Sequence, residues 1–448
     1  MNHTTIFPMK TKEARSMNSR TLLQTISTFV VLLLVLATGP VNEVMAQAGV
    51  TYYVDNQTGS DSNAGTAIGA PKQFLFSVNG ALAAAADGAT ISVANTGVTY
   101  SQNTVVTFAA NLTITSTGGT PVLNPAAGIT FNLTGGDVAA FTGAFSIASN
   151  VTFNAIAAGS VTGGNNLTLT GGVTVTYTGA VGGIMTGAWA SAAIGTLLYN
   201  GAGNFTTGAE FPATGVAILG IRTTGGNTVT LGASSTVTGA FDVDVSQTFA
   251  TGGNTLTLNR ATAGTNTHDV DGTVSATGTG GISLTGATHL FASGAANGTL
   301  PNVTVNVSAS VTIGDGATSI NGPQRILGDV TVTAGALNIY SVVGNTTTTG
   351  ITGNLTNNGS GAVTIDADGA AAATLRFGGN VSNSGTGTMV LGNAADADII
   401  NIIGNLVNNG TVTQTATGTG IAGAATITFI GSAASPVLTI SGSVTNSP

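Results

Sequence analysis

The chain has 448 residues, of which 66 are glycine, none is cysteine and only 6% are charged. Ordinary globular domains have roughly a quarter charged residues, and a nucleic-acid-binding protein needs a basic surface. The composition therefore excludes nucleic acid as a partner, and it excludes most soluble cytoplasmic enzymes as a class. A hydrophobic content of 42% is too high for a disordered chain, so we expect a long β-rich protein with nearly uncharged surfaces.

The amino terminus has the three parts of a secretory signal. Basic residues precede an apolar run at 29–37, and small-residue cleavage sites at Ala46 and Ala48 follow it. The run is much shorter than the ~20 residues that span a bilayer, although a retained anchor is the alternative. We predict a signal peptide over residues 1–48, a secreted protein that is extracellular or on the cell surface, and no membrane span after the signal is removed.

The exported part of the chain is weakly acidic. After residue 48 it has five basic and fifteen acidic residues, which gives a net charge of −10. This charge opposes binding to anionic lipid or nucleic acid. Because a chain without cysteine has no disulfides, the stability of the exported protein must come from extensive burial or from repetition.

The opening segment combines a strand, a turn-rich loop and a helix. Residues 52–55 form the expected strand, and residues 59–66 are rich in Gly, Ser, Asp and Asn. Apolar residues at helical offsets predict a helix over 74–86. Asp87 and Gly88 end that helix, and strands follow.

This order of elements, with Ala70-Pro71-Lys72 before the helix, resembles the start of a known family. Over residues 52–100 it is similar to the pectin-lyase-like right-handed parallel β-helix family of bacterial secreted and surface proteins. The resemblance implies that residues 49–88 form a first strand and a short amino-terminal capping helix, which covers the open end of a solenoid. The family includes polysaccharide lyases, hydrolases, adhesins and structural proteins, so the resemblance does not choose an activity.

Internal repeats organise the rest of the chain. The segment 224–231 returns almost unchanged at 251–258. In the last third, the segment 353–359 recurs at 379–385 and again at 404–410, so the two intervals are nearly equal. A period of this length is typical of solenoids, whose repeats have roughly 20–45 residues.

Short alternating runs, such as 112–115 and 303–306, are separated by Gly, Asn, Ser or Ala. Alternation with period two indicates strands with one buried face, and Gly or Asn supplies the positive φ of tight corners. Three strands per turn, stacked turn on turn, predict an all-β right-handed parallel β-helix over residues 89–448. A string of antiparallel sandwich modules is the alternative, but it does not explain the periods.

The repeated Gly-Asn pairs should place asparagines at one corner of successive turns. Asn354, Asn380 and Asn405 would then stack as a ladder, in which side-chain amides bond neighbouring turns and the local backbone. The alternative is that asparagine is simply tolerated at a corner.

Residues for polysaccharide chemistry are scarce. Hydrolases of the resembled family have an Asp cluster with a nearby His and an Arg-x-Lys pair, whereas the exported chain has one lysine, Lys72, and isolated arginines. Glycosidases need two carboxylates, and the only exported glutamate, Glu210, has no acidic neighbour in sequence. We assign no catalytic and no cofactor-binding residues; the residues favour a non-enzymatic protein without excluding an enzyme.

One set of carboxylates points to a metal. Asp242 and Asp244 precede Asp269 and Asp271 by the same interval that separates segment 224–231 from its copy, so one turn would stack the two pairs. His268 is beside the second pair. Carboxylates this close repel one another unless a cation or proton intervenes, and carboxylate oxygens are ligands for Ca²⁺. We therefore predict a Ca²⁺ site there; the alternative is that these residues face solvent and provide charge. A weaker candidate set of carboxylates pairs Asp366 and Asp368 with Asp396 and Asp398.

Two further single residues are expected to have structural rather than functional positions. His289 is expected at the surface or at a corner. Trp189 is expected to fill core, although it could stack on a sugar ring.

The carboxyl-terminal repeat, 442–448, is followed by no cap, so we expect the helix to continue beyond residue 448 or to be uncapped there, with an anchoring module missing. The sequence favours an exported, non-enzymatic β-solenoid that acts as a cell-surface structural or adhesin-like protein. The alternative is a carbohydrate-binding or polysaccharide-degrading β-helix. Expected partners are polysaccharides or cell-surface ligands.

Overall fold

The computed structural model describes the chain from residue 49 onward. Segments outside the description are 74, 76–79, 102–104, 134–135, 155–159, 179–184, 261–265, 292–297, 314–324, 340–348, 366–373, 385, 392–398, 409–410, 416–425, 431–436, 441–443 and 447–448. Contacts divide the chain into units 1–46 and 47–448, and every described residue belongs to the second unit. The predicted signal peptide lies outside the described residues and stays a prediction.

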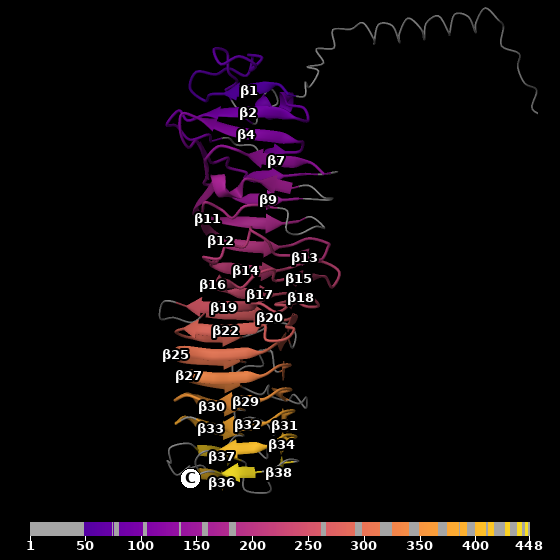
Figure 1. Ribbon diagram of the computed structural model, residues 1–448, viewed down its shortest axis with the longest axis vertical. Coiled ribbons are helices and arrows are strands. Elements are labelled where there is room, and N and C mark those ends of the chain that lie inside the picture. The colour runs from indigo at the N-terminus through magenta and orange to yellow at the C-terminus, as the bar shows by residue number, and fades with distance from the viewer. Residues whose placement is uncertain are drawn as a thin grey trace, which may run out of the picture. The chain divides into compact units, whose positions relative to one another are not determined.

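The second unit is a parallel β-solenoid, in which strands of successive turns pair with one another in parallel (Figure 1). A first sheet holds, in order, β1 (Thr51–Val54), β2 (Ala89–Ala94), β4 (Leu112–Thr117), β7 (Val138–Phe141) and β10 (Ser160–Thr162). A second sheet holds, in order, β13 (Phe205–Thr206), β15 (Thr228–Thr230), β18 (Thr248–Ala250), β21 (Thr273–Ser275), β24 (Thr299–Leu300), β26 (Arg325–Ile326), β28 (Thr349–Ile351), β31 (Thr374–Phe377), β34 (Ile399–Ile402) and β38 (Val437–Ile440).

The other strands form two more columns that long strands connect. The first column contains β5 (Val122–Leu123), β8 (Phe145–Ile147), β16 (Ser235–Val237), β19 (Thr255–Arg260), β22 (Gly281–Gly286), β29 (Leu355–Asn357), β32 (Val381–Asn383), β35 (Leu406–Asn408) and β39 (Val444–Asn446). The second column contains β3 (Val106–Phe108), β6 (Ile129–Phe131), β9 (Val151–Phe153), β14 (Ile218–Ile221), β17 (Phe241–Val243), β20 (Asn266–Val270), β23 (His289–Phe291), β30 (Ala362–Ile365), β33 (Thr388–Leu391), β36 (Thr411–Thr415) and β37 (Thr426–Ile430). The long strands are β11 (Leu167–Tyr177), β12 (Ser191–Tyr199), β25 (Val303–Ile313) and β27 (Val330–Ile339).

The sequence pattern explains this stacking. In β6, Ile129 and Phe131 are buried and Thr130 between them is not, so one face of the strand enters the core. Leu355 pairs with Val381, and Val381 pairs with Leu406, so equivalent positions of successive sequence repeats lie side by side. The predicted all-β parallel β-helix is confirmed.

Aromatic side chains stack along the core of the early turns. Phe108, Phe131, Phe153, Tyr177 and Tyr199 follow one another in the second column, with ring centroids 5.0, 5.1, 4.7 and 5.2 Å apart. Offset stacking of this kind adds to the free energy of burial. Each aromatic ring therefore ties two successive turns together.

The helix near the amino terminus is shorter than predicted. It is described as α2 (Ala81–Ala84), and it ends there because Ala85 has extended backbone angles, φ −79° and ψ 135°. The expected helical residues 74 and 76–79 lie outside the described residues. Tyr52 Oη donates a hydrogen bond to the Ala84 carbonyl oxygen at 2.8 Å, which joins the helix to β1.

A 3₁₀ turn, η1 (Gly164–Asn166), precedes β11. Within the described part of the chain, no helix has the length and apolar character needed to cross a membrane.

Candidate functional site

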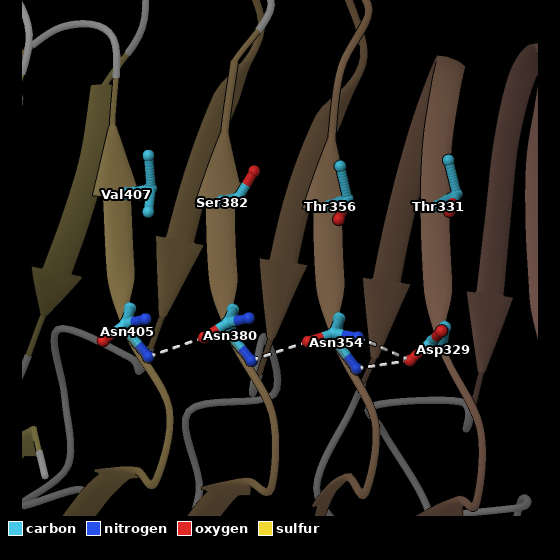
Figure 2. A pocket seen from close by; sticks show the side chains of 8 residues that line it. All are labelled: Asp329, Thr331, Asn354, Thr356, Asn380, Ser382, Asn405 and Val407. Carbon is cyan, nitrogen blue, oxygen red and sulfur yellow. Dashed lines mark hydrogen bonds between the residues drawn. The ribbon is translucent and has the colours of Figure 1, made fainter. Parts of the chain in front are cut away.

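A polar groove of about 360 Å³ runs across four turns of the first column. Figure 2 shows that two rows of side chains line it, one from the corner before each strand and one from the middle of each strand. The corner row is Asp329, Asn354, Asn380 and Asn405, and the strand row is Thr331, Thr356, Ser382 and Val407.

The corner row is a hydrogen-bonded ladder. The Oδ1 atom of Asp329 accepts the backbone N–H of Asn354 at 2.7 Å. The same contact follows from Asn354 to Asn380 at 2.9 Å and from Asn380 to Asn405 at 2.8 Å. Asn302 begins the row, because its Oδ1 accepts the N–H of Asp329 at 2.9 Å. The predicted asparagine ladder is confirmed for these turns.

The glycine before each ladder residue has a different role from the one predicted. Positive φ is not recorded at Gly353, Gly379 or Gly404, and among the described residues Ser246 is the only non-glycine residue with positive φ. A Cβ atom on Gly353 would collide with Asp329 Oδ1, and one on Gly379 would lie 2.6 Å from Asn354 Oδ1. Glycine is required at these corners because the preceding turn approaches closely, not because the backbone is left-handed.

The strand row continues beyond the groove in the same register. Thr331 pairs with Thr304 on one side and with Thr356 on the other. Further pairings extend the row back through Ser283, Thr257 and Thr236. Except at Val407, the row presents hydroxyl groups at a regular spacing of ~4.8 Å along the axis.

A second row of asparagines lies inside the core, and the sequence analysis did not predict it. Asn357, Asn383 and Asn408 are fully buried at the end of β29, β32 and β35. Asn357 Nδ2 donates to the Gly361 carbonyl oxygen at 2.9 Å, and Asn383 Nδ2 donates to that of Gly387 at 3.1 Å. Each copy of the repeat has a second asparagine after the corner one, so its recurrence was visible in the sequence, although the burial of an amide was not.

The four carboxylates of the predicted Ca²⁺ site lie on adjacent turns. Asp242 pairs with Asp269 in register. Arg222 donates from its guanidinium to Asp242 Oδ2 at 2.6 and 3.2 Å, and its Nε lies 3.8 Å from Asp244 Oδ1. The hydrogen bond to Asp242 raises the pKa of Arg222. Burial and the neighbouring charges of Asp242 and Asp271 raise the pKa of Asp244, although Arg222 opposes this.

Arg222 supplies a positive charge that the sequence analysis did not connect with these carboxylates. Arg222 precedes Asp242 by 20 residues, which is fewer than the residues between Asp242 and Asp269 on the next turn. The repeat interval therefore did not reveal the contact. Among the described residues, no group of three or more His, Cys, Asp or Glu is placed to hold a metal ion. The register that the calcium hypothesis needs is present, and calcium binding at Asp242, Asp244, Asp269 and Asp271 stays a prediction. The weaker set lies in 366–373 and 392–398, outside the described residues.

The two histidines of the exported chain are both in the core. His268 is fully buried and His289 is 1% exposed, so the expectation that His289 lies at the surface or a corner is wrong. His268 occupies the inward position beside outward Asp269, and it contacts His289 rather than the carboxylates. The Phe241 N–H donates to His268 Nδ1 at 3.1 Å, and His268 Nε2 lies 3.0 Å from His289 Nδ1. These hydrogen bonds allow two polar rings to be buried.

Glu210 is also fully buried, which its sequence neighbourhood did not predict. Its Oε1 accepts hydrogen bonds from Tyr199 Oη at 2.9 Å and from the Gly208 N–H at 2.8 Å. Trp189 Nε1 donates to the Glu210 carbonyl oxygen at 3.1 Å, and the Trp189 side chain belongs to the core, as expected. Burial raises the pKa of Glu210, while the hydrogen bonds to its carboxylate lower it.

No family model, curated protein or solved structure matches this chain. The parallel β-solenoid therefore follows from the structure itself, and the pectin-lyase-like family stays a resemblance of the opening segment.

Proposed function

We propose that this protein is an exported, non-enzymatic component of the cell surface with a structural or adhesin-like role. The observation that carries the proposal is the ladder of Asp329, Asn354, Asn380 and Asn405. It adds a side-chain hydrogen bond between successive turns, beyond those of the sheets. A surface protein exposed to proteases benefits from a backbone that is hydrogen-bonded in this way.

Other features support the same role. Pairing continues from β1 to β39 through the described turns, so strand edges are satisfied by neighbouring turns. The pectin-lyase-like likeness, including its right-handed coil, and the predicted signal peptide agree with a surface protein of bacterial type.

Labelling of intact cells tests the location. An antibody against the solenoid should label the protein on whole cells, and deletion of its gene should reduce attachment. Protein recovered only from the cytoplasm, with residues 1–48 still attached, would contradict the proposal.

A second candidate function is binding of a polysaccharide along the groove. Its lining combines amides and hydroxyls with one carboxylate, Asp329, and the rows follow the axis. Hydrogen-bonding groups in a row suit an extended, uncharged glycan better than an acidic one, which Asp329 would repel.

Affinity electrophoresis on gels containing neutral or acidic polysaccharides tests this candidate. Thr356→Val and Ser382→Ala remove hydroxyls from the groove without touching the ladder, and Thr152→Val, on the outer face of β9, is the matched control. Retention by a neutral glycan should fall in the groove variants only. Release of sugar fragments that Asp242→Asn or Asp269→Asn abolishes would instead establish a degrading enzyme.

A further inference from the structure

A loop between β13 and β14, residues 207–217, places a carboxyl group in the core. We call it the Glu210 loop. Besides Glu210, which is fully buried, it buries Phe211 and Val216, which are 5% and 2% exposed. The loop covers the end of the aromatic stack, where Tyr177 and Tyr199 lie.

The two oxygen atoms of the Glu210 carboxyl group differ in their hydrogen bonds. Glu210 Oε1 accepts two hydrogen bonds, from Tyr199 Oη and from the Gly208 N–H. Glu210 Oε2 and Tyr177 Oη are both buried and have no hydrogen-bond partner among the described residues. An ionised carboxylate would present a charged, unpaired oxygen to the core, which is very costly.

A neutral carboxylic acid removes the charge from this unpaired oxygen. Its carbonyl oxygen accepts the two hydrogen bonds that Oε1 receives, and its hydroxyl group, at Oε2, is a donor. Neither Oε2 nor Tyr177 Oη makes a hydrogen bond in the closed loop, and an uncharged pair of this kind costs far less to bury than a charge. The neutral form therefore needs no counter-ion.

The electrostatic surroundings agree with this assignment. The titratable groups that act on Glu210 are Tyr177 on β11 and Tyr199 on β12, and the pKa of each phenol is raised by burial and by Glu210. Burial raises the pKa of Glu210 itself. Trp189 contributes an uncharged N–H to the Glu210 carbonyl oxygen.

We propose that Glu210 is held as a neutral carboxylic acid, and that its ionisation is the trigger that releases the Glu210 loop from the core. The closed loop keeps one proton more than the open loop at any pH between the carboxyl's ordinary range and its value in the core. Raising the pH through this window therefore favours the open loop, by up to about tenfold in population for each pH unit. Opening uncovers the Tyr199 and Trp189 side chains.

Fluorescence and hydrogen exchange of the full chain test the proposal between pH 5 and pH 9. Trp189 is the only tryptophan in the sequence, so all tryptophan emission comes from a side chain that contacts this loop. As the pH rises, we expect the emission to shift to longer wavelength and amides of residues 207–217 to lose protection.

Glu210→Gln is the decisive variant, because its amide keeps the acceptor for Tyr199 and Gly208 and cannot ionise. Its emission and exchange should not change with pH. Asp87→Asn, which removes an exposed carboxylate, is the matched control and should behave like the wild-type protein. Equal pH dependence in Glu210→Gln and wild type would overturn the proposal.

An infrared spectrum of the wild-type protein keeps the test decisive if Glu210→Gln does not fold. At neutral pH, the folded protein should show the carbonyl band of a protonated carboxyl group in a nonpolar environment. Absence of this band would show that Glu210 is ionised and would overturn the assignment.

Discussion

The early and late turns of the solenoid hold together by different means. In the early turns, Phe131, Phe153 and Tyr177 stack in the core, with ring centroids 5.1 and 4.7 Å apart. In the late turns, Asn357 and Asn383 occupy the core beside aliphatic residues, and the outer corner has its own amide ladder. One backbone arrangement is therefore stabilised either by apolar contact area or by repeated, directional hydrogen bonds.

The largest effect should come from breaking the aromatic stack. Phe153→Ala removes a fully buried ring that contacts Phe131, Tyr177 and Trp189. Loss of contact area and the cavity that remains should lower the free energy of unfolding by about 3–5 kcal/mol. Chemical denaturation of the full chain measures this change, and Phe153→Leu should lower the free energy of unfolding by less than Phe153→Ala. A cost below about 1 kcal/mol would mean that the stack is not what holds the early turns.

The turns around His268, between the early and the late turns, should lose stability in acid. Burial, with His289 and Arg260 nearby, lowers the pKa of His268 to about 3 from 6.5. The unfolded chain therefore binds protons before the folded chain does, and stability falls as the pH drops from 6.5 towards 3. The slope reaches about 1.4 kcal/mol per pH unit for each histidine. His268→Gln should flatten this slope in melting experiments, and an unchanged slope would contradict the prediction.

Removing an inner amide should cost less than removing a ring. Asn357→Leu deletes the hydrogen bond to the Gly361 carbonyl oxygen and leaves that group in the core. We expect the free energy of unfolding to fall by about 1–3 kcal/mol. Chemical denaturation measures it, and Phe153→Leu, in the early turns, is measured in parallel for comparison. Equal stability of Asn357→Leu and wild type would show that the late core tolerates apolar residues as the early core does.

Breaking one step of the outer ladder should have a smaller effect. Asn380→Ala removes the acceptor for the Asn405 N–H, an exposed contact. A loss of about 0.5–1.5 kcal/mol is expected, together with faster hydrogen exchange at Asn405. Thr152→Val is the control and should leave both quantities unchanged.

The smallest effect should come from the exposed ion pair. Arg222→Ala removes the contact with Asp242. Because the Arg222 side chain is 52% exposed, we expect the free energy of unfolding to fall by only about 0.2–1 kcal/mol. If the carboxylates bind Ca²⁺, calcium should raise the melting temperature, more in Arg222→Ala, and not in Asp244→Asn/Asp271→Asn. An unchanged melt with calcium and with chelator in all these proteins would reject the calcium site.

Positions that recur at a constant interval were predictable, and residues that meet through irregular turns were not. The Asn354–Asn380–Asn405 ladder follows directly from the repeated Gly-Asn segments. The pairs His268–His289 and Arg222–Asp242 are separated by shorter stretches of chain than the repeat. Because turn length varies along the chain, the sequence alone could not show that these pairs lie on adjacent turns.

Buried polar groups were missed for a related reason. Glu210 has no acidic neighbour in sequence, and its partners, Tyr199 and Trp189, lie 11 and 21 residues earlier in the chain. Asn357 occupies an inward position, but the alternation of apolar and polar residues does not predict a buried amide. Such groups become visible only when the core is assembled.

The outer ladder has a consequence for how this protein can change in evolution. Each asparagine requires from the next turn only a main-chain N–H, which any residue other than proline provides, and a glycine that allows close approach. A duplicated or deleted copy of the repeat therefore creates the same junctions that were there before. The molecule can lengthen or shorten by whole copies, and selection can adjust its reach without redesigning its interior.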